Sequence, residues 1–350
     1  MKVKLKYISK YSKIIDSNKT QCLLCSHYCV ISNNGYGKCK VRKNIDNQLI
    51  AQNYGAITGV AIDPIEKKPL YHYMPGAKVL SFGCFGCNFK CINCQNYSIS
   101  DSDIFDIEKI IADNNNYSTP DILLDLAIQN KCEGIAYTYS EPTVFWDFCE
   151  DIIKLAKINA PELKHIVVTN GFFSNELIKS IIENNFIDAM NIDLKFINNK
   201  YHAICDAQLK PILKNIENIY KKSNIQIEIT NLLIPTLNDS DDDIKKLCDF
   251  IANLSTDIPI HFSKFFPIYK SKYLLPTFES TLLRAREIAE EVGLKYVYIG
   301  NTELANVSDT HCPECHELMI KRNGYSTNIL GVKESNFIKC NKCNFKLKIK

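Results

Sequence analysis

The chain has 350 residues, a length that favours two domains or one large α/β barrel with attachments. It is 46% hydrophobic and 23% charged, a globular composition that argues against a disordered chain. The 42 basic and 39 acidic residues leave a formal net charge of +3, which gives no support for a specialist in nucleic-acid or membrane-surface binding. The unusual count is cysteine, with 16 residues.

The ends and the hydropathy of the chain bear on its compartment. Residues 1–8 alternate charged and apolar side chains, without the apolar core and cleavage site of a secretory signal. No run approaches the ~20 apolar residues that a membrane span needs. We therefore expect a cytoplasmic protein with no membrane partner, in a compartment where stable disulfides are rare. Cysteines in that setting indicate metal or redox chemistry, unless they are scattered core residues.

The spacing of the cysteines divides them into groups. Three groups of four are Cys22, Cys25, Cys29 and Cys39; Cys84, Cys87, Cys91 and Cys94; and Cys312, Cys315, Cys340 and Cys343. The isolated ones lie among apolar neighbours, and we interpret them as small buried hydrophobes without a site: Cys132, Cys149, Cys205 and Cys248.

Between the second and third cysteine groups, short β-branched or aromatic runs alternate with helical segments. The runs predict seven strands, at 79–82, 134–138, 165–168, 189–192, 225–229, 258–262 and 296–299. Several are apolar on both faces, as expected of strands covered by helices. Apolar spacing predicts helices over 176–184 and 279–293, the second ending in Gly293. We interpret Asp241–Asp243 as acids in the first turn of a helix rather than as a metal site.

This alternation predicts an α/β fold, a partial or near-complete parallel βα (TIM-like) barrel. We expect an N-terminal cysteine-rich extension over residues 1–75, the barrel over 76–305 and a C-terminal zinc-ribbon-like module over 306–350. Chemistry in such barrels sits at the C-terminal ends of the strands. Seven polar residues occupy such positions in the predicted strands: Cys87, Glu141, Asn170, Asp193, Lys195, Asn231 and Lys264.

The loop after the first predicted strand carries Cys87, Cys91 and Cys94 in the spacing C-x3-C-x2-C. A structural zinc site needs four ligands in a closed tetrahedron. Three thiolates on one loop can instead bind three irons of a [4Fe–4S] cluster and leave the fourth iron open to a small ligand. Cys84 could supply a fourth thiolate, but it lies at the strand end before the loop turns. Because a fourth thiolate would close the cluster, we interpret Cys84 as a bystander.

The same loop resembles the signature of the radical S-adenosylmethionine (radical SAM) superfamily. Glu141-Pro142 occupies the place of the superfamily's Gly-Gly-Glu-Pro segment, with Tyr139 and Ser140 in place of the glycines. With Asn191–Lys195 and His261–Pro267, the chain resembles the pyruvate formate-lyase activating enzyme branch. More narrowly, it is similar to the AmmeMemoRadiSam system radical SAM enzymes in three further segments: Cys22–Cys29, Gly35–Arg42 and Tyr296–Asn301.

The resemblance implies an oxidoreductase whose reduced [4Fe–4S] cluster cleaves S-adenosylmethionine to methionine and a 5′-deoxyadenosyl radical, which abstracts hydrogen from a substrate. It also implies an electron donor such as flavodoxin or ferredoxin, and a Memo-like protein partner. The predicted cofactor-binding residues each have a structural alternative. Glu141 would bind the ligand's ammonium, or serve as an ordinary helix N-terminal acid. Asn170 and Asn231 would bind carboxylate or ribose, or shape turns; Asp193 and Lys195 would bind the cofactor, or only pair with each other. His261 would line the methionine pocket, or pack within its strand.

The two flanking cysteine groups predict further metal sites. Cys312-x2-Cys315 and Cys340-x2-Cys343 have the spacing of paired metal-binding knuckles, and zinc is the simplest metal for them to bind. An auxiliary iron–sulfur cluster or free thiols on a disordered tail are the alternatives. Cys22, Cys25, Cys29 and Cys39 are enough for zinc or for a fully ligated cluster, with His27 as a structural neighbour.

Three functions are therefore compared. The first is a radical SAM enzyme acting on a protein or small molecule. The second is an activating enzyme that makes a glycyl radical in another protein. The third is a non-catalytic binding module, with zinc at all three cysteine groups.

Overall fold

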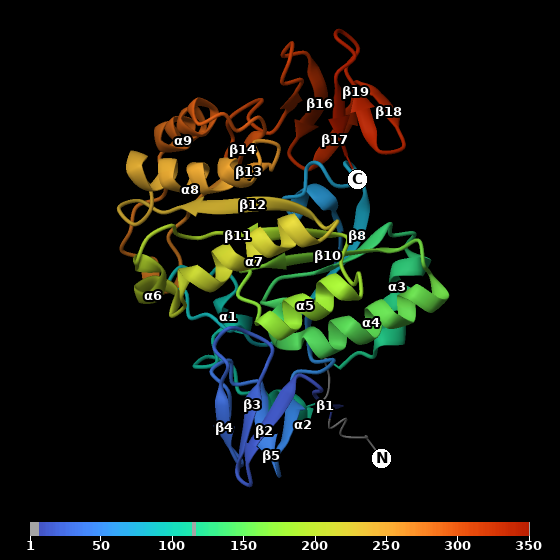
Figure 1. The fold of residues 1–350 in the computed structure, drawn as a ribbon, viewed down its shortest axis with the longest axis vertical. Helices are drawn as coiled ribbons and strands as arrows, with labels where there is room; N and C mark the ends of the chain where they lie inside the picture. The colour runs from blue at the N-terminus through green and yellow to red at the C-terminus, as the bar shows by residue number, and fades with distance from the viewer. Residues whose placement is uncertain (1–6, 114–116, 350) are drawn as a thin grey trace.

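The computed structural model describes residues 7–113 and 117–349 (Figure 1). At its centre is a sheet of eight strands in the order β14-β13-β12-β11-β10-β9-β8-β7, and all neighbours from β8 to β14 are parallel. The seven parallel strands are β8 (Lys78–Cys84), β9 (Gly134–Tyr137), β10 (Lys164–Thr169), β11 (Ala189–Asp193), β12 (Gln226–Leu233), β13 (Ile260–Lys264) and β14 (Val297–Gly300). Each overlaps one predicted strand, so the α/β fold with a partial parallel barrel is confirmed. The barrel is open, because β14 and β7 are the edges of the sheet.

The eighth strand, β7 (Ile57–Pro64), was not predicted. It pairs antiparallel with β8, from Ile57 against Cys84 to Pro64 against Lys78. Gly59 and Pro64 interrupt its β pattern, and Val60 is exposed as the edge position allows. β7 belongs to residues 1–75, so the segment expected as an N-terminal extension also supplies a strand to the central sheet.

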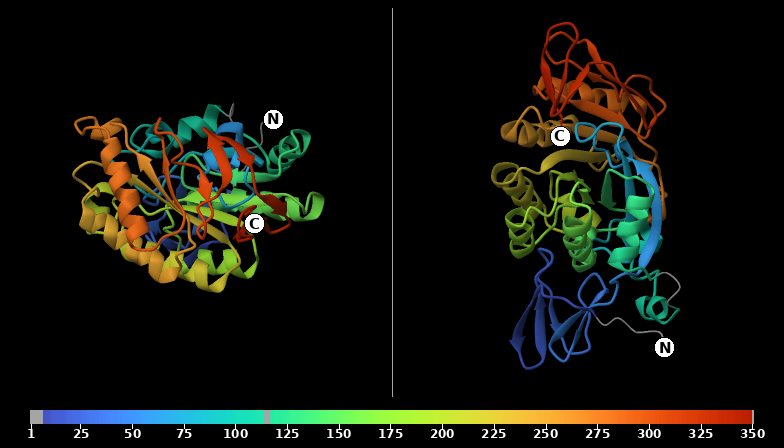
Figure 2. Two further views of the ribbon diagram at one scale, coloured as in Figure 1. Left: turned by 90° about the horizontal axis from the view of Figure 1, so that it is seen from above. Right: turned by 90° about the vertical axis from the view of Figure 1, so that its right-hand side faces the viewer.

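Helices cover the outer face of this sheet and connect its parallel strands (Figures 1 and 2). They are α3 (Pro120–Gln129), α4 (Trp146–Asn159), α5 (Asn175–Glu183), α7 (Leu209–Lys222), α8 (Asp241–Leu254) and α9 (Glu279–Glu291). The helices predicted over 176–184 and 279–293 are confirmed as α5 and α9. The acidic run opens α8 behind the N-cap hydroxyl of Ser240, which accepts a hydrogen bond from the backbone N–H of Asp243. The helical interpretation of that run is confirmed.

Shorter elements lie in the connections. They are α1 (Tyr97–Ser100), α2 (Ile107–Asp113), α6 (Lys200–Cys205) and the 3-10 turns Ile65–Lys67, Pro142–Phe145 and Tyr269–Ser271. None of the helices in the described parts of the chain is both long and apolar enough to cross a membrane.

The N-terminal residues form two three-stranded antiparallel sheets at the bottom of Figure 1, beside α1. One sheet has the order β1 (Tyr7–Ile8), β6 (Gln48–Ala51), β5 (Arg42–Ile45). The other has the order β2 (Ser12–Asp16), β3 (Lys19–Cys22), β4 (Val30–Ser32). These sheets dock on the loop after β10. Cys25 makes a β-bridge to Phe173, and the Ser174 hydroxyl donates to the Leu23 carbonyl at 2.5 Å. The loops of this N-terminal module are thereby held at the rim where the parallel strands end.

The C-terminal residues form two more antiparallel sheets, at the top of Figure 1 beside β13 and β14. Their strands are β15 (Thr310–His311), β16 (Leu318–Asn323) and β17 (Ser326–Ile329), then β18 (Val332–Glu334), β19 (Phe337–Lys339) and β20 (Lys346–Lys348). Arg322 anchors this module: its guanidinium stacks 4.1 Å above the Tyr71 ring and donates to the Tyr71 carbonyl at 2.9 Å.

Candidate active site and metal centres

The central cysteine loop follows β8 at the rim of the open barrel. Cys87, Cys91 and Cys94 are all partly exposed, whereas Cys84 is fully buried within the strand. Backbone N–H groups already point at two of the loop thiols: Phe89 donates to Cys87 Sγ at 3.4 Å, and Asn96 donates to Cys94. Such hydrogen bonds favour a thiolate over a thiol, and the thiolate is the form that binds metal.

A buried carboxylate, Glu141, braces this loop through the neighbouring strand ends. Glu141 is 3% exposed and accepts four hydrogen bonds: two from Thr143, one from the Thr169 hydroxyl at 2.7 Å and one from the Asn170 backbone N–H at 2.8 Å. Burial raises the pKa of Glu141, and these donors oppose that shift. The Asn170 side chain then donates to Asn88 Oδ1 at 2.7 Å, next to Cys87. Glu141 and Asn170 therefore position the cysteine loop, whereas their binding of cofactor stays a prediction.

Asp193 and Lys195, at the end of β11, face the other side of the loop. Their side chains form a 2.7 Å ion pair. Although burial opposes it, the charges of Asp193 and Cys91 raise the pKa of Lys195 well above its usual value. In return, the Lys195 charge favours the thiolate of Cys94 against the effect of burial. The structure therefore places the Lys195 ammonium beside the thiols of the loop, so Lys195 does more than pair with Asp193.

Cys205 was interpreted as a buried hydrophobe without a site, but its thiol lies beside the central loop. It shares a hydrogen bond with the thiol of Cys91, and that bond lowers the pKa of Cys91 while burial opposes the shift. Its backbone carbonyl also accepts a hydrogen bond from Lys90 at 3.1 Å. The end of α6 therefore closes over the loop. Nothing local in the sequence signals this contact, because 113 residues of chain separate the two cysteines.

Asn231 and His261 lie on neighbouring strands, and each is held by chain atoms. The Asn231 amide donates to the Leu194 carbonyl at 2.7 Å and supports the turn that carries Lys195. His261 shares a 2.7 Å hydrogen bond with the buried carboxylate of Glu228 and meets the Tyr71 ring edge-on. Both residues have the structural role that was the alternative in the sequence analysis, and their contact with cofactor stays a prediction.

Comparison with known proteins agrees with this arrangement. A family model described as the Radical SAM superfamily matches residues 83–251, which include the end of β8, the cysteine loop and β9 to β12. An uncharacterized protein of Methanocaldococcus jannaschii is 38% identical over 340 residues, spanning 97% of this chain and 98% of its own. The chain belongs to the radical SAM superfamily.

More distant similarities are also found. A putative glycyl-radical enzyme activating enzyme of M. jannaschii is 27% identical over 180 residues, spanning 48% of this chain and 68% of its own. A domain of pyruvate-formate lyase-activating enzyme from Bacteroides vulgatus covers 48% of this chain and 99% of its own, at 22% identity and a TM-score of 0.40. A radical SAM methyltransferase from Sphaerobacter thermophilus covers 84% of this chain and 76% of its own, at 10% identity and a TM-score of 0.48.

This radical SAM chain departs from the Gly-Gly-Glu-Pro pattern at Tyr139, and the structure shows how. Tyr139 has φ 65°, in the left-handed region that glycine adopts without strain. Its hydroxyl donates to Asp63 at 3.1 Å, and the Lys68 ammonium lies 5.1 Å from the centre of its ring. These contacts from β7 and the segment after it hold Tyr139 in a backbone conformation that the glycine of the superfamily pattern would adopt without strain.

The C-terminal cysteines converge as expected of a closed metal site. The Sγ atoms of Cys312, Cys315, Cys340 and Cys343 all lie within 4.8 Å of one another. The closest pairs are 3.5 and 3.6 Å apart, near the edge of about 3.8 Å for a tetrahedron of thiolates about 2.3 Å from zinc. Burial opposes ionisation of Cys340, but backbone N–H groups of Cys343 and Lys342 outweigh it and lower the pKa of that thiol to about 7. The four thiols can hold a metal, and zinc at this site stays a prediction.

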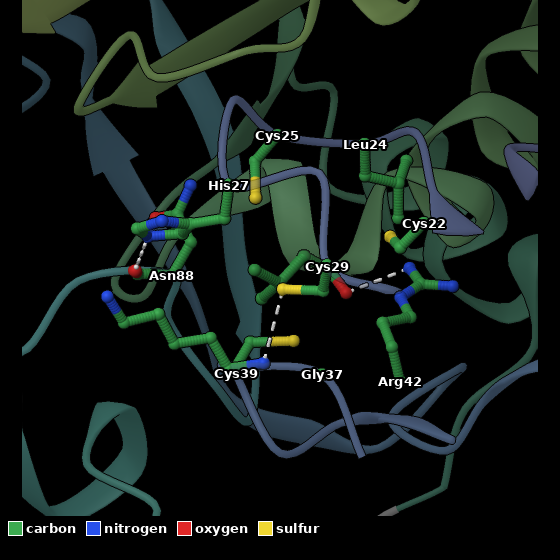
Figure 3. Close-up of a pocket in the computed structure, with 11 residues that line it drawn as sticks. Cys22, Leu24, Cys25, His27, Cys29, Gly37, Cys39, Arg42 and Asn88 are labelled. Atoms are coloured by element: carbon green, nitrogen blue, oxygen red, sulfur yellow. Dashed lines mark hydrogen bonds between the residues drawn. The ribbon is translucent and has the colours of Figure 1, made fainter. Parts of the chain in front are cut away.

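The N-terminal cysteines also gather in one place. Cys22, Cys25, Cys29 and Cys39 line a single pocket together with His27, Arg42 and Asn88 (Figure 3). His27 shares a 2.8 Å hydrogen bond with the carbonyl of Asn88, so the pocket directly adjoins the central loop.

Proposed function

We propose that this protein is a radical SAM enzyme in which Cys87, Cys91 and Cys94 hold a [4Fe–4S] cluster with one iron free for S-adenosylmethionine. The observation that carries the proposal is the set of three partly exposed cysteines on one rim loop of a radical SAM chain. The superfamily implies both the cluster and S-adenosylmethionine. When bound and reduced by an external one-electron donor, the cluster would supply one electron to the sulfonium of S-adenosylmethionine, whose S–C5′ bond would break to give methionine and a 5′-deoxyadenosyl radical.

The residues around the loop suit that cofactor. The backbone N–H groups of Phe89 and Asn96 stabilise bound thiolates, as hydrogen bonds to cluster sulfurs do in general. Lys195 adds a positive charge beside thiolates whose cluster carries net negative charge. Cys84 takes no part in the proposal, because it lies within β8 before the loop turns and a fourth thiolate would close the open iron. Three ligands leave one iron open, as substrate chelation requires.

The test is cleavage of S-adenosylmethionine by anaerobically reconstituted protein. With a strong reductant, we expect 5′-deoxyadenosine, together with iron and sulfide bound at the central loop. Cys91→Ala should abolish cleavage, whereas Cys248→Ala, a matched change at a buried cysteine of α8, should preserve it. A protein that holds only zinc and gives no cleavage would instead be the non-catalytic binding module.

A second candidate function is the activation of a glycyl-radical enzyme. It is favoured by the 27% identity to the putative activating enzyme of M. jannaschii. Under this proposal the hydrogen comes from a glycine Cα of a protein partner, and electron paramagnetic resonance would detect the resulting radical in that partner. The AmmeMemoRadiSam assignment is also part of the proposal and rests on the segments Cys22–Cys29, Gly35–Arg42 and Tyr296–Asn301. It predicts a Memo-like protein that copurifies with this chain, with flavodoxin or ferredoxin as the electron donor.

A further inference from the structure

We propose that Cys22, Cys25, Cys29 and Cys39 hold a second, fully ligated iron–sulfur cluster that lies directly beside the central cysteine loop. Figure 3 shows the four side chains entering one pocket, Cys22 from the end of β3 and the other three from the loops between β3 and β5. The site is separate from the central thiols, and the proposal does not depend on cleavage of S-adenosylmethionine.

The first support is the backbone around the four sulfurs. Lys38 donates its N–H to Cys29 Sγ at 3.4 Å. The other three thiols each accept a backbone N–H from the residue two positions further along, which is Leu24, His27 and Val41 for Cys22, Cys25 and Cys39 respectively. The same i to i+2 pattern occurs at Cys87 and Cys94 of the central loop. Each sulfur is therefore placed as a metal-bound thiolate would be.

The second support is an unsatisfied cation. The side chain of Arg42 is 1% exposed, lines the pocket and reaches toward Cys22 in Figure 3. Its Nη atoms are engaged by Asp147 and by the Val144 carbonyl at 2.8 Å, but its Nε–H has no hydrogen-bond partner among the described residues. A buried donor without a partner costs about 1–3 kcal/mol, more when it is charged. Four thiolates around a cluster leave net negative charge, which is the partner that this guanidinium lacks.

The distances between the sulfurs bear on whether the N-terminal cysteines would hold a zinc ion or an iron–sulfur cluster. Among the residues that the structure describes, only the C-terminal set brings three or more ligand atoms within 4.8 Å of one another. No three of the N-terminal thiols come this close to one another, nor do the three thiols of the central loop. A single zinc ion draws its thiolates to edges of about 3.8 Å. In a cubane cluster each thiolate binds a different iron, so a wider ring of sulfurs fits the cluster rather than zinc.

Two contacts connect this site to the central loop. His27, next to Cys25 in the pocket, bonds the Asn88 carbonyl. On the other side, Lys38 forms a 2.8 Å ion pair with Asp206, the residue after Cys205. A cluster in the N-terminal pocket would thus be a one-electron carrier separated from the central thiols by little more than a histidine and a loop.

The experiment uses the full chain with the central site removed. Cys87→Ala, Cys91→Ala and Cys94→Ala are combined, and the protein is reconstituted anaerobically with iron and sulfide. We expect about four irons and four sulfides per chain to remain, with visible absorbance that dithionite bleaches. Adding Cys22→Ala and Cys29→Ala should remove them, and adding Cys248→Ala instead should leave them in place.

The triple variant can refute the proposal whether or not the N-terminal variants fold, because its own N-terminal residues are unchanged. Loss of the iron on adding Cys22→Ala and Cys29→Ala then shows that the retained iron is bound at the N-terminal cysteines and not at the C-terminal set. The proposal is overturned if the triple variant takes up no iron, or if it contains about two zinc ions per chain and resists iron. Because this variant cannot cleave S-adenosylmethionine in any case, its iron content is independent of the outcome for the proposed function. If the unaltered chain gave no cleavage while the triple variant retained iron, only the proposed function would be refuted.

Discussion

The side-chain amide of Asn170 donates a 2.7 Å hydrogen bond to Asn88 Oδ1, which joins the end of β10 to the loop that carries Cys87. The Asn170 backbone N–H is at the same time bound to Glu141. One buried residue therefore connects three segments of the rim.

Removing the Asn170 side chain should disturb the position of the cysteine loop. We expect Asn170→Ala to destabilise the protein by about 1–3 kcal/mol, since it removes the hydrogen bond to Asn88 Oδ1 and takes the acceptor away from the buried backbone N–H of Phe172. Displacement of the loop should lower the rate of S-adenosylmethionine cleavage by between about tenfold and a hundredfold. The measurements are denaturant unfolding and 5′-deoxyadenosine formation. Asn184→Ala, at the exposed end of α5, is the control, and equal behaviour of the two variants would contradict the positioning role.

Cys205 provides a test of the ligand count at the central loop. Its thiol bonds that of Cys91, so it is a neighbour of the cluster ligands whether or not it is one of them. If three thiolates suffice, Cys205→Ala removes one hydrogen bond, worth ~1 kcal/mol, and should change cleavage by no more than about tenfold. Cys91→Ala, the comparison, should abolish it. Equal loss of cleavage in both variants would make Cys205 a ligand.

Zinc in the C-terminal module can be examined separately from the iron sites. A module of this size buries little apolar surface, so metal binding should supply most of its folding free energy. We expect Cys340→Ser with Cys343→Ser to lose about one zinc per chain. Hydrogen exchange should then become fast in β15 to β20 while β9 to β12 remain protected.

The control for this change is Cys132→Ser, which alters a buried cysteine outside the three groups. It should leave the zinc content as it was. Protection of β15 to β20 that survives in the metal-free double variant would show that the module folds on its own apolar contacts.

The parallel strands and the central motif could be predicted because their signals are local. Each strand is a short β-branched run, and C-x3-C-x2-C follows the first of them directly. β7 also contains β-branched residues, but Gly59 and Pro64 interrupt the run and most of its residues are exposed or partly exposed, as an edge strand allows. Sequence reasoning therefore found the interior of the sheet and missed its edge.

Contacts across the chain account for the other differences. Cys205 reaches Cys91 only because α6 folds back over the loop, where the carbonyls of Ile204 and Cys205 accept hydrogen bonds from Ile92 and Lys90. His261 is held by Glu228, whose other oxygen contacts come from the backbone of Tyr71 and His72. Such partners are set by tertiary packing, so spacing along the sequence could not identify them.

The stability of the protein should depend on pH through His72, a buried residue that contacts Tyr298. Burial lowers the pKa of His72 from 6.5 to about 4, and its ring bonds the Tyr298 hydroxyl at 2.6 Å. Between these two pKa values the unfolded chain binds a proton that the folded chain excludes, so stability falls as pH falls from about 6.5 towards 4. The folded state should lose about 2 kcal/mol from this group between about pH 7.5 and about pH 5.

The measurement is urea unfolding of the unaltered chain and of His72→Gln at both pH values. Titrating groups far from His72 contribute nearly equally to the two proteins, so the difference between them reports His72 together with Glu228, the carboxylate with which its charge interacts. Glutamine keeps a polar group near Tyr298 but does not titrate. We expect His72→Gln to be the less stable protein at about pH 7.5 and to lose about 2 kcal/mol less than the unaltered chain on acidification. Parallel losses in the two proteins would mean that His72 is protonated in the folded state as readily as in the unfolded one.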